Sequence, residues 1–168
     1  YYRGANRVAP YNLYAHTRRL LSEARHASKA HDIGFRFGPP PPGGRTTHAK
    51  SVSYPAASFR FTWSAARRRW LVWMDGARAR ATEGGQLGAP TVVIEYTRVR
   101  TSGYLEHMRR PPYAVTVSSG RALVLRDGKA YRTHWSRRRA TGGTTFTLPS
   151  GQRMTFARGP VWIVLAYR

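Results

Sequence analysis

The sequence predicts a mainly β fold of the β-rich α+β class, an antiparallel sandwich or open barrel with one N-terminal helix packed on it. Short runs of alternating apolar and polar residues fill the chain after Ser51. Turn signals separate these runs at intervals of about eight to twelve residues, which is typical of sandwiches and barrels. Helical periodicity occurs near the N-terminus. No βαβ alternation is visible, which argues against a parallel α/β fold.

The composition limits the classes of protein to which the chain can belong. Its 168 residues suit one domain, or one domain with an extension, and 41% hydrophobic residues is typical of a globular chain. The absence of cysteine excludes disulfides, thiolate metal sites and a cysteine nucleophile. No run approaches the roughly 18 apolar residues that span a bilayer.

The charge balance points to anionic partners. Lysine and arginine number 29 against 7 acidic residues, which gives a net charge of +22 and a pI near 11.7. Such an excess favours binding to nucleic acid, to an anionic lipid surface or to an anionic polymer of the cell envelope.

The N-terminal part is expected to be helical. Asn12 can cap a helix, and apolar residues recur at helical spacing from Leu13 to Ala30. Gly34 can end it in a left-handed conformation. The chain then divides into residues 1–34, a helical segment that is a junction or the end of an upstream domain; residues 35–50, a loop rich in proline and glycine; and residues 51–168, an antiparallel β domain.

The later runs predict strands in a regular order. "SFRFTWSA" and "RRWLVWMDG" alternate and are joined by a loop of arginines, which predicts a hairpin. "APTVVIEYTRV" is mainly apolar and is expected to be the central strand. Asp75-Gly76, Asp127-Gly128 and Ser150-Gly151 are tight-turn signals. Further strands are expected at "YAVTVSSG", "RALVLRDG", "KAYRTHWSR", "TTFTLPSG", "QRMTF" and "PVWIVLAY".

Few residues suggest catalysis. Glu95 lies within an apolar strand, where a carboxylate is either paired with arginine or placed in a cleft with a raised pKa; we favour the ion pair. Glu106-His107 precedes "RRPP" and offers an acid and a base side by side, and His134 is a further candidate. The histidines lack metal-ligand spacing, and no GxSxG or phosphate-binding glycine motif is present. We therefore assign no catalytic residue, metal or cofactor.

Basic residues gather in three predicted loops. If the loops share one end of the sheet, they form an anion cradle beside tryptophan rings; otherwise they are solvated hairpin tips that protect strand edges. The tryptophans follow the strand period, which favours a place in the core. The candidate polyanion-binding residues are Arg67, Arg68, Arg69, Arg109, Arg110, Arg137, Arg138 and Arg139.

An ordered series of segments resembles the C-terminal portion of the YerB-like bacterial lipoproteins, a family of unknown function. "RVAPYNLY" resembles the family's "APHNLY" junction, and "RRRWLVWMDG…APTVVIEYTRV" resembles its strand, turn and apolar strand. "SGRALVLRDGKAYRTHWSR…TTFTLPSGQRMTFARGPVWIVL" is similar to its closing pattern. The sequence departs from the family at Tyr11, where histidine is usual, and at Pro90-Thr91, where asparagine is usual.

The resemblance implies that the chain is part of a longer protein. It implies an upstream domain and an extracytoplasmic location, anchored to the membrane through a lipidated N-terminus that is not present in this chain. It implies no catalytic residue.

These observations lead to a ranked expectation of function. We expect a non-enzymatic binding or structural module of the cell envelope, whose basic loops contact anionic lipid or envelope polymer. One alternative is a nucleic-acid-binding β domain that uses the same arginines. A second is an envelope hydrolase built on Glu95 or on Glu106 and His107.

Overall fold

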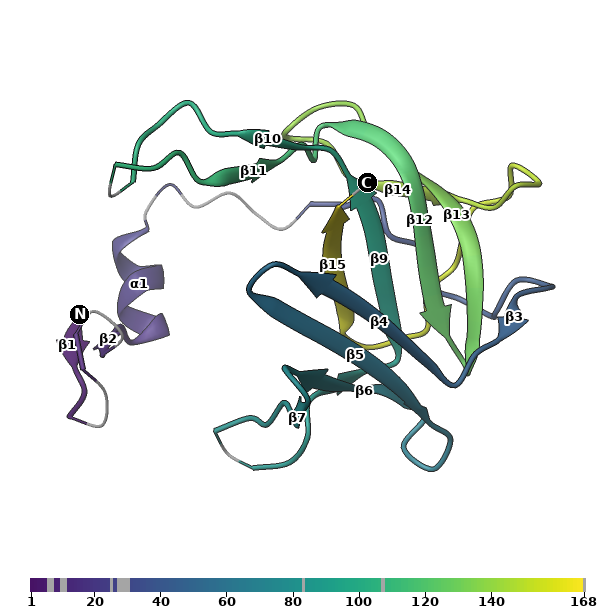
Figure 1. Cartoon of the computed structure of the whole chain (residues 1–168), viewed down its shortest axis with the longest axis horizontal. Helices are drawn as coiled ribbons and strands as arrows, with labels where there is room; N and C mark the ends of the chain where they lie inside the picture. Colours follow the sequence, from purple (N-terminus) through teal and green to yellow (C-terminus); the bar gives the residue numbers. More distant parts are fainter. Residues whose placement is uncertain are drawn as a thin grey trace. The chain divides into compact units, whose positions relative to one another are not determined.

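The computed structural model describes residues 1–5, 8–9, 12–24, 26, 31–82, 84–106 and 108–167. The chain forms two compact units, Tyr1–His31 and Asp32–Arg168 (Figure 1).

The N-terminal unit contains a small β ribbon and a short helix. Strands β1 (Tyr2–Arg3) and β2 (Leu13–Tyr14) pair in antiparallel fashion, and α1 runs over Thr17–Glu23. The helix therefore begins after the position expected for it, with His16 at its N-cap.

Asn12, the expected N-cap, has a different role in the structure. Its side chain accepts a hydrogen bond from Arg3 at 2.7 Å and donates one to the Gly4 carbonyl at 3.3 Å, so it fastens the ribbon and does not cap the helix. Most of the predicted helix after Ala24 lies outside the described residues. The packing of α1 on the β domain stays a prediction.

The second unit confirms the mainly β prediction. Its large sheet has the order β14-β13-β12-β9-β15, with β3 beside β13. As predicted, the apolar run forms an interior strand, with five of its first six residues buried on both faces. The strands are β3 (Arg45–Thr46), β9 (Thr91–Thr97), β12 (Ser118–Arg126), β13 (Lys129–Arg137), β14 (Thr145–Thr147) and β15 (Val161–Tyr167).

One strand of this sheet departs from the expected antiparallel pattern. β15 pairs with β9 in parallel, so that Ile163 lies beside Val93 and Leu165 beside Glu95. Alternating hydrophobicity specifies which face a side chain takes and not the direction of the strand, so the sequence pattern could not reveal this. The run "QRMTF" also forms no strand: it makes isolated bridges at Arg153 and Phe156, while Met154 is buried beneath them.

A smaller sheet crosses the large one obliquely (Figure 1). It has the order β4-β5-β6-β7, with β8 beside β6, and contains the predicted hairpin. Its strands are β4 (Ala49–Tyr54), β5 (Ala57–Ser64), β6 (Arg69–Met74), β7 (Ala77–Arg78) and β8 (Gly88–Ala89). A separate hairpin is formed by β10 (Val99–Thr101) and β11 (Pro112–Ala114).

Two hydrophobic clusters hold these elements together. Between the sheets, Phe61, Trp70 and Val72 pack against the face of the large sheet that carries Ile94 and Leu125, and all five side chains are fully buried. On the opposite face of the large sheet, the segments around Phe35 and Phe156 cover Val93, Val124 and the neighbouring pair Trp135 and Phe146. β12 and β13 thus belong to both clusters, because their successive side chains alternate between the two faces.

The predicted turns are present. Asp127 and Gly128 both have positive φ (50° and 69°) and join Arg126 to the opposite Lys129, as in a two-residue hairpin. Gly128 has a second role, because a Cβ on it would lie 3.0 Å from the Trp63 indole nitrogen. The turn of the large sheet therefore closes directly on the small sheet.

A pair of glycine variants tests this contact. Gly76 also has positive φ (80°) in the Asp75-Gly76 turn, but a Cβ there meets nothing within 4 Å. We expect Gly76→Ala to lose about 1 kcal/mol from left-handed strain alone, and Gly128→Ala to lose about 1 kcal/mol more because Trp63 must move. Urea unfolding of both variants measures the difference. Equal losses would contradict the contact.

Candidate functional site

A groove opens in the angle between the two sheets. Its volume is about 840 Å³. One wall is the segment 45–50, which leaves the large sheet as β3 and enters the small sheet as β4. The other wall is the face of β12 and β13 that looks toward the small sheet, with Leu123 and Ala130 continuing from the core onto the groove floor.

Basic side chains line both walls of this groove. Arg45, His48 and Lys50 come from the segment 45–50, while Arg121 and Arg132 come from β12 and β13. The hairpin register explains why the last two share a face: Arg121 lies opposite His134, and Leu123 lies opposite Arg132. Diagonal neighbours of this kind are about 7–8 Å apart.

The positive charge of the groove is not neutralised by the described part of the chain. No acidic residue is among the lining residues. Within the described ranges, none of the four arginine and lysine side chains makes an ion pair; the pairs found there are Arg36–Asp32 and Arg126–Asp127. A concave site with four like charges concentrates a positive potential and attracts anions.

The three arginine loops predicted as a cradle do not meet at one place. Trp63, next to the Arg67–Arg69 loop, lies against Gly128 at the start of β13, whereas Arg137 ends that strand, roughly 26 Å away. Arg109 and Arg110 belong to the β10–β11 hairpin, which leaves the C-terminal end of β9, at the same end of the large sheet as Arg137 (Figure 1). Binding by these loops stays a prediction, but the Arg67–Arg69 loop would act separately from the other two.

Arg137 differs from Arg138 and Arg139, which follow it in the sequence. Its guanidinium donates to the carbonyls of Ala140 and Gly142, so it holds the loop that follows β13. Arg138 and Arg139 are exposed.

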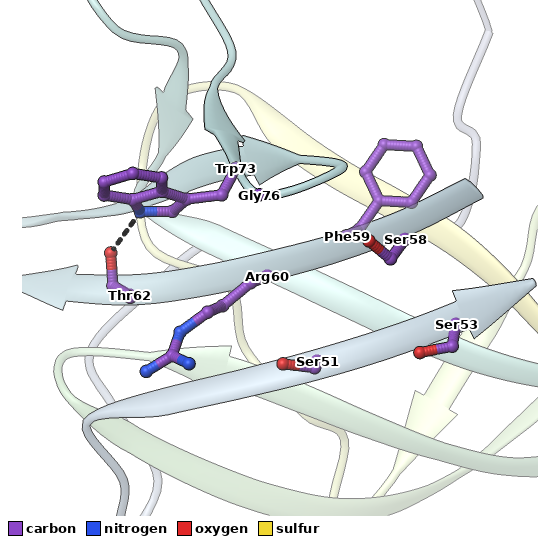
Figure 2. Close-up of a pocket in the computed structure, with 8 residues that line it drawn as sticks. All are labelled: Ser51, Ser53, Ser58, Phe59, Arg60, Thr62, Trp73 and Gly76. Atoms are coloured by element: carbon purple, nitrogen blue, oxygen red, sulfur yellow. Dashed lines mark hydrogen bonds between the residues drawn. The ribbon is translucent and has the colours of Figure 1, made fainter.

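The tryptophans largely take the expected core positions. Trp70 and Trp135 are buried, and Trp63 and Trp162 pack against the first cluster. Trp73 is different, because it lies on the outer face of the small sheet in a depression of about 600 Å³ (Figure 2). Its indole N–H donates to Thr62 Oγ1 at 3.0 Å, and the Arg78 guanidinium lies 5.5 Å from its ring. The ring is therefore fixed and half-exposed.

Glu95 is buried without the arginine partner that we expected. Its side chain is 5% exposed and makes no ion pair with any described residue. Burial raises the pKa of the Glu95 carboxyl to about 7, and the charge of Arg137 only partly opposes this. Glu95 lies on the face of β9 away from the groove and lines neither depression. The pKa of Glu95 is raised, but neither of these two cavities would bring a substrate to it.

The remaining catalytic candidates are dispersed. Glu106 is exposed near the end of the β10–β11 hairpin, and His107 lies outside the described residues. His134 is exposed on β13 with Arg121 opposite. No group of three or more His, Cys, Asp or Glu that would suit a metal ion occurs in the described ranges. Across those same ranges, no helix has the length and hydropathy to span a membrane.

The fold and the groove define a class: a β-sandwich domain with a cationic groove between its sheets. The family can be stated from the sequence of residues 50–163, which matches the family described as "Protein of unknown function (DUF3048) C-terminal domain". The match covers more than half of the chain, and the chain belongs to this family.

A solved structure agrees with this assignment. The chain is similar in fold to the crystal structure of YerB protein from Bacillus subtilis, with a TM-score of 0.75 and 14% sequence identity. The similarity covers 99% of this chain and 56% of that protein, so the chain corresponds to little more than half of the YerB protein. No curated protein matches the chain. The YerB-like resemblance is thus confirmed at the level of family and fold.

The buried carboxyl gives a prediction about stability and pH. Because the folded pKa of Glu95 is raised from 4.5 to about 7, the folded chain holds a proton that the unfolded chain releases between these values. Stability therefore falls as pH rises through this window. We expect Glu95→Gln to remove this decline and to be more stable than the parent above pH 7, by up to about 3 kcal/mol.

Urea unfolding between pH 4 and pH 8 measures this effect. The exposed Glu106→Gln is the control and should follow the parent. If Glu95→Gln and the parent lost stability in parallel across the window, the raised pKa would be contradicted.

Proposed function

We propose that this domain is a non-catalytic binding module that holds an extended anionic polymer of the cell envelope in the groove between its sheets. The observation that carries the proposal is the convergence of Arg45, Lys50, Arg121 and Arg132 on one groove that no described acid neutralises. Arginine donates to phosphate and carboxylate oxygens through two parallel N–H groups, and lysine adds a point charge.

The shape of the groove supports a polymer over a compact ligand. It is partly open to solvent and is not an enclosed cavity, and its basic residues come from both walls. Arg121 and Arg132 are exposed and make no ion pair within the described chain, so they need not break such a pair to reach a ligand. The Thr46 hydroxyl supplies a neutral donor between the charges, whereas the Thr47 hydroxyl already donates to the Arg45 carbonyl at 3.0 Å.

The non-catalytic part of the proposal is supported by the dispersal of the titratable groups. Glu95 lies in β9, His134 in β13 and Glu106 between β10 and β11, and no ion pair joins them to other groups within the described residues. The location in the cell envelope, with a lipid-anchored N-terminus and an upstream domain, follows from the YerB-like resemblance and is part of the proposal.

Nucleic acid is the second candidate, and Trp73 is the observation that favours it. A fixed and half-exposed indole can stack on a base. However, Trp73 lies on the outer face of the small sheet, whereas the groove lies on the inner side of β4. A strand that used both would have to cross the edge of β4, so we rank this candidate below the envelope polymer.

The groove and the loops can be separated by paired variants. We expect Arg121→Ala/Arg132→Ala to weaken binding to polyphosphate at least about tenfold, because two phosphate contacts are lost. The control is Arg67→Ala/Arg68→Ala, which removes the same charge from an exposed turn and should bind like the parent. Isothermal titration at low salt measures both. If the control variant lost as much affinity for polyphosphate as the groove variant, binding would depend on net charge alone and the proposed site would be contradicted.

Salt dependence and the choice of polymer complete the test. We expect affinity to fall steeply with salt, and four contacts with a single nucleic-acid strand would give a log–log slope of about −3. Polyphosphate and single-stranded DNA should bind alike, and Trp73→Ala should leave both unchanged. If Trp73→Ala weakened binding of DNA alone, the nucleic-acid candidate would replace the proposal. Binding that did not change between low and high salt would contradict both.

A further inference from the structure

The β10–β11 hairpin carries a feature that the groove does not explain. Its ladder continues past the two strands: the Ser102 N–H donates to the Pro111 carbonyl at 2.9 Å, and Glu106 and Arg109 exchange two backbone hydrogen bonds of 2.7 and 2.9 Å. The hairpin therefore extends well beyond the end of β9 as a finger (Figure 1).

The end of this finger exposes large apolar side chains. Tyr104 is 66% exposed, Leu105 63% and Met108 91%. Met108 also has a φ of 66°, in the left-handed region that a residue with a side chain rarely adopts. A residue with a strained backbone and an apolar side chain that is almost wholly exposed adds nothing to the folding of the domain, which points to a binding role.

The end of the finger is braced from within. The Arg110 guanidinium donates to the carbonyls of Ser102 (3.3 Å) and Gly103 (2.9 Å), and the Ser102 hydroxyl donates to the Tyr104 carbonyl at 2.9 Å. The apolar side chains are thus held outward before any partner arrives, which lowers the entropy lost on binding.

The apolar end is surrounded by positive charge. The segment 98–115 contains four arginines and one glutamate. Arg100 and Arg109 are exposed, Arg100 pairs across the hairpin with Tyr113, and Tyr113 is 53% exposed. Apolar residues at the end, tyrosine behind them and arginine around them are the combination found where proteins meet the interface of an anionic membrane.

We propose that the end of the β10–β11 hairpin inserts into the surface of an anionic lipid bilayer. Leu105 and Met108 enter the boundary of the acyl chains, and Tyr104 and Tyr113 lie at the level of the headgroups. Arg100 and Arg109 contact lipid phosphates, while Arg110 acts as the positioning residue that keeps the loop in shape.

A bilayer suits this surface better than a protein partner does. The exposed apolar surface is a small convex tip of three side chains, far below the roughly 800 Å² that each partner contributes to a stable protein interface. A bilayer needs no complementary pocket and accepts a narrow projection. Glu106 opposes anionic lipid, so it limits the depth and strength of insertion.

This inference is independent of the groove. The groove is lined by residues of the segment 45–50, β9, β12 and β13, and the finger shares none of them. A domain with both features would bind the envelope polymer in the groove and the membrane at the end of the finger.

The test uses vesicles of phosphatidylcholine, alone or mixed with phosphatidylglycerol. We expect the parent to sediment with the mixed vesicles and Leu105→Ser/Met108→Ser to bind them at least about tenfold more weakly. Arg100→Gln/Arg109→Gln should lose about thirtyfold and most of the salt dependence. Glu106→Gln should bind more tightly than the parent. The groove variant Arg121→Ala/Arg132→Ala is the control and should keep its vesicle binding.

Insertion itself can be measured with a fluorophore attached to an introduced cysteine, because the chain has no cysteine of its own that would also be labelled. An environment-sensitive dye on Met108→Cys should shift to the blue with mixed vesicles, and the same dye on Ser150→Cys, in an exposed turn, should not. Unchanged vesicle binding by Leu105→Ser/Met108→Ser would overturn the proposal. A blue shift of the dye on Met108→Cys that polyphosphate produces without lipid would also overturn it. A concentration-dependent dimer that Leu105→Ser/Met108→Ser abolishes would overturn it as well.

Discussion

The arrangement of the sandwich depends on one segment that belongs to both sheets. Residues 45–50 pair with β13 and then with β5, and two backbone hydrogen bonds fix the crossing: the Thr47 N–H donates to the Gly128 carbonyl, and the Trp63 N–H to the His48 carbonyl, each at 2.9 Å. Gly128 favours this crossing, because a Cβ there would lie only 3.0 Å from the Trp63 ring, which would have to move. The sheets are thus joined at one corner and diverge from it, and the cationic groove occupies the angle between them.

This geometry has an electrostatic cost that a ligand would relieve. Arg45 and Lys50 are brought close to Arg121 and Arg132 by the same crossing that closes the core. Like charges repel, so the crossing is stabilised by apolar burial around Phe61 and Leu125 and opposed by the groove. Glu95 adds a second cost on the other face of the sheet, since its carboxylate is desolvated. An anionic ligand would stabilise the folded chain through mass action.

Much of the framework could be predicted from the sequence, but the site could be predicted only in part. Alternation identified the β5–β6 hairpin, and the mainly apolar run identified the interior strand β9. The Asp127-Gly128 turn fixes the register that places Arg121 and Arg132 on one face, so those two residues could have been found. The opposite wall, formed by residues 45–50, could not have been found in this way. The segment 35–50 is rich in proline and glycine and was predicted to be a loop, and its pairing depends on strands that are distant in the sequence. The parallel direction of β15 and the lack of an ion pair at Glu95 among the described residues could not be predicted either, because both depend on residues that are distant in the sequence.

The central claim is that the polyanion binds in the groove and not over the basic surface as a whole. The most direct measurement is an NMR titration of the isotope-labelled domain with polyphosphate, followed through backbone amide shifts. The account predicts that the changes concentrate in residues 45–50 and in the halves of β12 and β13 that carry Arg121 and Arg132. Changes of equal size at the Arg67–Arg69 loop and at Arg138 and Arg139 would contradict it.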